Sequence, residues 1–116
     1  MVQPKFNGYN SKDMKLLQYQ LNASVDFLKS VTDTGISKDK NIQKAIDKNL
    51  LEAFIYINSI RLLTDIQILK SEEEAEFCKC HHALSDTLSN MPLTDNVRKE
   101  SYTFALKCQQ TIMGGF

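Results

Sequence analysis

The sequence predicts an all-α protein, an antiparallel four-helix bundle with one long central helix. Three observations support this fold class. The 116-residue chain contains only four glycines and two prolines, so residues that break helices are scarce. Apolar residues recur at intervals of three and four over most of residues 11–113, which is the helical period. No stretch alternates apolar and polar residues long enough to predict a strand, and the length predicts a single domain over residues 1–116.

The first helix follows an extended N-terminal arm, which we expect over residues 1–9. Either Asn10 or Ser11 can cap the helix, because both side chains accept hydrogen bonds from free amides of the first turn. The segment Thr-Asp-Thr-Gly at 32–35 ends it. The stripe expected to face the core consists of Met14, Leu17, Leu21, Val25 and Leu28.

The second helix begins at Ser37 or Asp39 and carries the most apolar segment of the chain. Its periodic pattern continues to about Leu69, which predicts a central helix of roughly 30 residues, about 45 Å long. A break within it is an open alternative, because Thr64 and Asp65 can cap a new helix. We expect Leu50 and Ile57, on the main stripe of this helix, to be core residues.

Capping residues also mark the starts of the third and fourth helices. Ser71 is followed three residues later by Glu74, a capping-box pattern in which the glutamate reaches back to the cap. The third helix is expected to continue to about Asn90. Thr94 caps the fourth helix, which runs to about Met113 before two glycines.

The sequence predicts neither a strongly charged partner, such as nucleic acid, nor a membrane-spanning helix. The formal charges balance, with 14 Lys and Arg against 14 Asp and Glu, so we do not expect nucleic acid as the partner. Lys40, Lys44 and Lys48 nevertheless form one stripe and leave weak nucleic-acid binding as an alternative. No apolar run reaches the roughly 18 residues of a membrane span. Three cysteines do not form a disulfide framework, which predicts a cytoplasmic protein.

The most informative feature is a surplus of apolar helix faces. The first and fourth helices each carry a second apolar stripe beside the one that faces the core. Large exposed apolar surfaces usually mark interaction sites, so we expect a non-enzymatic, protein-binding or regulatory protein that forms a homodimer. The second helix is the alternative contributor, because it is apolar nearly all round. The predicted interaction surface consists of Leu16, Tyr19 and Phe27 with Tyr102, Leu106 and Met113.

The segment Phe-Cys-Lys-Cys-His-His at 77–82 raises the question of a metal site. At about 100° per residue, Cys78 and His82 point away from the buried face, Cys80 points into it, and His81 lies near its edge. Only Cys78, His81 and His82 are therefore candidate ligands, fewer than the four of a structural zinc site. We expect neither metal nor another cofactor, with metal binding by these three residues as an alternative.

The segment His-His-Ala-Leu-Ser-Asp at 81–86 resembles the local pattern of histidine phosphotransfer domains, which are four-helix bundles with a solvent-facing histidine. The resemblance implies phosphoryl transfer through His82. Ser85 and Asp86 stand where those domains usually carry a lysine and a glycine, and an acidic residue repels an incoming phosphoryl group. No other pattern assembles a nucleophile, a base and an oxyanion site, so we do not expect an enzyme.

Overall fold

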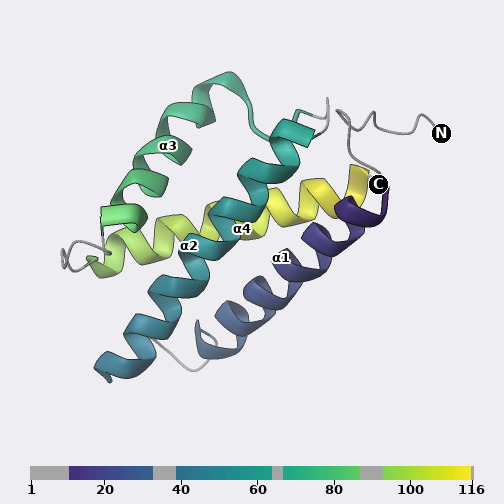
Figure 1. Ribbon diagram of the computed structural model, residues 1–116. Coiled ribbons are helices and arrows are strands. Elements are labelled where there is room, and N and C mark those ends of the chain that lie inside the picture. The colour runs from purple at the N-terminus through teal and green to yellow at the C-terminus, as the bar shows by residue number, and fades with distance from the viewer. Residues whose placement is uncertain (1–10, 33–38, 64–66, 87–92, 116) are drawn as a thin grey trace.

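A computed structural model shows four helices arranged as a compact bundle (Figure 1). It describes residues 11–32, 39–63, 67–86 and 93–115, and the expected arm over residues 1–9 lies outside this part of the chain. The predicted all-α bundle is confirmed, and the described residues contain no strand. The helices are α1 (Ser11–Thr32), α2 (Lys40–Leu63), α3 (Ser71–Asp86) and α4 (Asp95–Gly115).

The central position of α2 is also confirmed. α2 is the longest helix, with 24 residues, and it contacts each of the other three. α1 runs antiparallel along one side of α2, and α3 lies on the other side (Figure 1). α4 crosses α2 and also contacts α1 and α3. A helix that contacts three others must bury a wide face, which explains why α2 is apolar over most of its circumference.

α2 ends earlier than the sequence pattern predicts. The structure shows residues 67–70 as non-helical, so the expected continuation to Leu69 is wrong. Ile68 and Leu69 are buried, although they belong to the connection between α2 and α3. Ile68 and Leu69 keep the apolar spacing of a helix because their side chains pack into the core, although the helix has already ended. The possible break at Thr64 and Asp65 lies outside the described residues.

Local capping explains where the helices begin. Asp39 Oδ1 accepts hydrogen bonds from the amides of Asn41 and Ile42 at the start of α2. Thr94 Oγ1 accepts one from the amide of Val97 at the start of α4, as predicted.

The capping box of α3 is shifted by one residue from the prediction. Lys70 occupies the cap position, and Glu73 Oε1 accepts its amide at 3.0 Å. Glu74 instead pairs with Arg61 of α2. The acidic run at 72–74 offers a carboxylate in either register, so the sequence pattern alone does not distinguish them.

The core is built around the buried face of α2. Leu50 and Ile57 are fully buried, as predicted from their stripe. Phe54 stacks on Phe77 of α3 with ring centroids 4.5 Å apart, and Phe77 meets the ring of Phe104 of α4 edge-on. This aromatic group joins α2, α3 and α4 and places α3 against the rest of the bundle.

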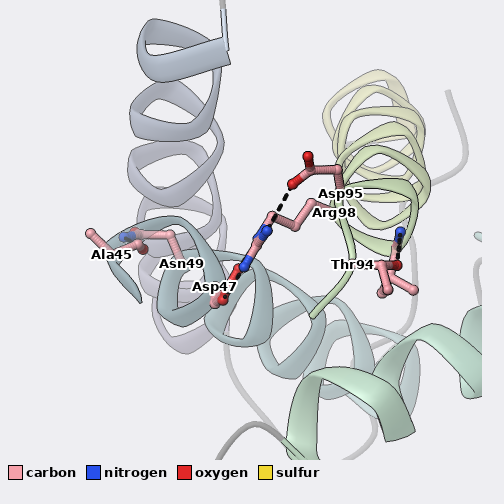
Figure 2. Close-up of polar contacts among 7 residues, drawn as sticks. Ala45, Asp47, Asn49, Thr94, Asp95 and Arg98 are labelled. Atoms are coloured by element: carbon pink, nitrogen blue, oxygen red, sulfur yellow. Dashed lines mark hydrogen bonds and ion pairs between the residues drawn. The ribbon is translucent and has the colours of Figure 1, made fainter. Parts of the chain in front are cut away.

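A nearly buried ion pair fixes α4 on α2 (Figure 2). Arg98 Nε and Nη2 donate to the two carboxylate oxygens of Asp47 at 2.7 and 3.1 Å. Arg98 Nη1 also donates to Asp95 Oδ1 on its own helix. The hydrogen bond to Asp47 is the main cause that raises the pKa of Arg98, so the guanidinium stays charged although it is buried.

Candidate interaction surface

The six residues predicted as an interaction surface differ in exposure. Leu16, Tyr19 and Met113 are exposed, with 57%, 73% and 47% of their surface accessible. Phe27, Tyr102 and Leu106 are half-buried, and the last two pack against the core. The apolar surface that remains open therefore lies on the N-terminal half of α1 and the C-terminal end of α4.

The start of α1 and the ends of α2 and α4 lie at the same end of the bundle, and Leu62 of α2 is also exposed there (Figure 1). Leu62 is 76% exposed and lines a shallow groove of about 380 Å³ together with Leu17 of α1. On the other side of α1, the amide nitrogen of Asn22 lies 3.7 Å from Met113 Sδ. Residues three apart on a helix are neighbours, so Tyr19 lies one turn from Asn22. The exposed apolar residues at this end of the bundle, here called the end patch, are Leu16, Tyr19, Leu62 and Met113.

Polar contacts beneath the end patch hold its helices in place. Gln109 Nε2 donates to Asn22 Oδ1 at 2.9 Å, which leaves the Asn22 amide nitrogen directed at Met113. This pair links the middle of α1 to the last turns of α4. The end patch is thus formed by side chains on helices that pack against each other.

Leu62 is the member that the predicted surface omitted. It belongs to the outer stripe of α2 with Leu51 and Ile55, and Ile55 is also exposed. This stripe is the signal in the sequence that could have identified Leu62. Three neighbouring helices cannot cover the whole circumference of α2, so part of an apolar helix of this kind must stay exposed. Leu62 lies opposite Leu17 because of how α1 and α2 align along each other. The apolar spacing within a single helix does not predict this alignment.

The cysteines and histidines of α3 point in different directions, as the helical spacing predicted. Cys78 and His82 are exposed, and His82 Nε2 lies 3.5 Å from Asp86 Oδ2. Cys80 is buried, and Cys108 of α4 is fully buried. No three side chains of His, Cys, Asp or Glu among the described residues are placed to hold a metal ion together.

His81 belongs to a polar chain between α2 and α3. Asn58 Oδ1 accepts a hydrogen bond from Arg61, so its amide nitrogen faces His81 Nδ1 at 3.0 Å. That ring nitrogen must therefore be the unprotonated acceptor. Burial lowers the pKa of His81, in agreement with a neutral imidazole. His81 thus has a structural partner in this chain.

The buried thiols are poor nucleophiles. Burial is the main cause that raises the pKa of Cys80, and it raises the pKa of Cys108 to about 12. A thiol reacts as its thiolate, so both side chains act as small apolar groups at neutral pH.

The lysine stripe lies on the solvent side of α2. Lys40, Lys44 and Lys48 are all exposed, and Lys48 Nζ lies 4.0 Å from Glu52 Oε1. An exposed pair of this kind is screened by salt and contributes little to stability.

Comparisons with protein-family models, curated proteins and solved structures find no match for this chain. Within the described residues, no helix combines the length and the hydropathy that a membrane crossing requires.

Proposed function

We propose that this protein is a non-catalytic, protein-binding and regulatory module that associates with a second copy of itself through the end patch. One observation carries the proposal: four large apolar side chains, each between 47% and 76% exposed, gather at one end of the bundle. Removing such surface from water is favourable by about 25 cal/mol per Å². Large exposed apolar surfaces on a folded domain are typical of interaction sites.

A second copy is the partner that this surface favours. A two-fold dimer places the same patch on both sides of the contact, so apolar residues meet apolar residues without a second specialised surface. The formal charges of the chain cancel, so two copies carry no net repulsion. Tyr19 adds a ring that packs while its hydroxyl stays hydrated, a residue type enriched at interfaces.

A stable dimer requires more area than the end patch alone. Stable interfaces bury on the order of 1,200–2,000 Å² in total, or roughly 600–1,000 Å² per copy. We therefore expect the contact to continue along the outer side of α1 to Phe27 and along α2 to Ile55. Both residues extend the stripes that contain Leu16 and Leu62, and both retain accessible surface.

The test compares glutamate substitutions inside and outside the end patch. Leu62→Glu and Leu16→Glu introduce carboxylates that stay hydrated on a monomer but lose water without a partner at the interface. Ile42→Glu is the matched control, because Ile42 is 39% exposed near the other end of α2. Circular dichroism and thermal melting of each variant verify that the bundle remains folded.

Light scattering during size-exclusion chromatography at micromolar concentration measures the outcome. We expect wild type and Ile42→Glu at twice the chain mass of 13.2 kDa, and Leu62→Glu and Leu16→Glu at the monomer mass. A wild-type monomer throughout this range contradicts self-association. A dimer that survives both patch substitutions contradicts the assignment of the interface.

A cytoplasmic location is part of the same proposal. Cys78, Cys80 and Cys108 are all free, although Cys78 is exposed to oxidants. Free exposed thiols persist where glutathione and thioredoxin keep the compartment reducing.

A further inference from the structure

A polar chain links α2 to α3 beside the stacked rings of Phe54 and Phe77. Arg61 Nη1 donates to Asn58 Oδ1 at 3.1 Å, and the amide nitrogen of Asn58 lies 3.0 Å from His81 Nδ1. A guanidinium has only donors, so the oxygen of Asn58 must face Arg61 and its NH2 group must face His81. The contact between the two helices therefore requires an unprotonated Nδ1 on His81.

Two contacts with α3 hold Arg61 in place. Its Nη2 donates to Glu74 Oε1 at 3.1 Å, and its guanidinium carbon lies 5.4 Å from the centre of the Phe77 ring, within the range of an attractive cation–π contact. Rotation of the Asn58 amide would let its oxygen accept from a protonated His81, but it would turn the NH2 group toward the donors of Arg61. One of the two hydrogen bonds of Asn58 is thus lost in either orientation once His81 carries a second proton.

The charged groups around His81 are already paired or lie on another side of α3. Close to it in space or in the chain are the paired Arg61 and Glu74, the paired His82 and Asp86, and the thiol of Cys78. The charged groups that act on Cys80 or pair across to α4 are Glu73, Glu76, Lys79, Glu100 and Lys107. At about 100° per residue, Glu76 and Lys79 lie roughly 140° and 160° around α3 from His81. Burial is the cause that lowers the pKa of His81.

α3 has few other contacts that could replace the bond to Asn58. Its buried side chains are Phe77, Cys80 and Leu84, and the ring of Phe77 packs beside that of His81 with centroids 6.3 Å apart. A protonated imidazole is stabilised by water, to which it gains full access when α3 separates from α2. Acid therefore favours the separated state over the packed one.

We propose that the contact between Asn58 and His81 is a pH-sensitive latch, in which protonation of His81 favours a state with α3 separated from α2. In that state the rings of Phe54 and Phe77 meet water. The proposal is independent of self-association, because the end patch consists of residues of α1, α2 and α4 and contains no residue of α3.

Hydrogen exchange followed by mass spectrometry tests the latch. Protection factors of α3 peptides, corrected for the intrinsic exchange rate at each pH, are compared at pH 7.5 and pH 5. We expect them to fall roughly three- to tenfold in acid, the net effect of one hydrogen bond. Low concentrations of urea should change them little, because a partial opening exposes less surface than global unfolding. Unchanged protection in acid, or a urea dependence as steep as that of global unfolding, overturns the proposal.

Three variants assign the effect to its residues. Asn58→Asp places a carboxylate that accepts from both Arg61 and a protonated His81, so acid should no longer lower the protection of α3. His81→Gln removes the titrating group and should make this protection independent of pH. His82→Gln is the matched control, because it removes the exposed neighbouring histidine and should keep the response of wild type. A response that survives in Asn58→Asp or His81→Gln, or that disappears in His82→Gln, contradicts the assignment.

Nitrogen NMR of the histidine rings tests the packed state without any substitution. The chain contains two histidines, and at pH 7.5 the ring of His81 should carry its proton on Nε2 and none on Nδ1. A proton on Nδ1 in the folded protein overturns the proposal, even where a variant fails to fold.

Discussion

Removal of the Asp47 carboxylate should destabilise the bundle strongly, because this side chain pairs with a buried charge on another helix. The side chains of Arg98 and Asp47 are only 10% and 15% exposed, so Asp47→Ala leaves a guanidinium charge close to the core. Breaking a buried pair by deleting one partner typically costs about 3–5 kcal/mol. Asp95 remains beside Arg98, which reduces the expected loss to about 2–4 kcal/mol. At about 4 °C per kcal/mol for a domain of this size, the melting temperature should fall by roughly 8–16 °C.

Urea unfolding followed by circular dichroism gives the free energy directly. Asp95→Ala is the matched control, because it removes a carboxylate from the same guanidinium but at a side chain that is 63% exposed. It should cost only about 0.5–1 kcal/mol. The double variant Asp47→Ala/Arg98→Ala should lose less than the sum of the single variants, since no unpaired charge remains. Equal losses for Asp47→Ala and Asp95→Ala would refute the argument that burial makes this pair important.

Three further predictions concern the core, pH and thiol reactivity. Leu50→Ala should cost about 2–5 kcal/mol in urea unfolding, because Leu50 is fully buried, and a loss below about 1 kcal/mol would contradict its place in the core. Burial holds the pKa of His81 below the ordinary 6.5, so its contribution to stability is complete above that pH and is lost as the pH falls below it. Unfolding of wild type and His81→Gln from pH 7.5 to 5 should therefore show a steeper decline for wild type, and parallel curves would contradict this. Ellman's reagent should label Cys78 in the native protein and reach Cys108 only after unfolding, so rapid labelling of Cys108 would refute its burial.

Sequence reasoning succeeded where the determining interactions are local. Thr94 caps α4 as predicted, because the hydrogen bond joins residues only three positions apart. Leu50 and Ile57 are buried because the stripe that contains them spans the most apolar helix. The spacing of apolar residues wrongly extended the second helix to Leu69, because a buried connection can be as apolar as a buried helix.

The exposure of the six residues of the predicted interaction surface was predictable only in part. Leu16 and Tyr19 are exposed on the second stripe of α1, whereas Leu106 on the matching stripe of α4 packs against the core. Which side of α4 remains open depends on its rotation against α1 and α2. That rotation is related to contacts such as the Asp47–Arg98 pair, whose members lie 51 positions apart in the chain. No periodicity of a single helix contains this information.

α3 is held to the bundle by few buried side chains, so it should separate from the other helices more easily than they separate from one another. α3 buries only Phe77, Cys80 and Leu84 over 16 residues, whereas α2 buries seven residues over 24. A helix with few buried residues can separate at a lower free energy than the whole domain unfolds, so we expect the amide hydrogens of α3 to exchange through a partial opening. Such an opening removes Phe77 from its stack on Phe54 and brings the Cys80 thiol into water. We therefore expect the Cys80 thiol to react through this partial opening, before the whole domain unfolds.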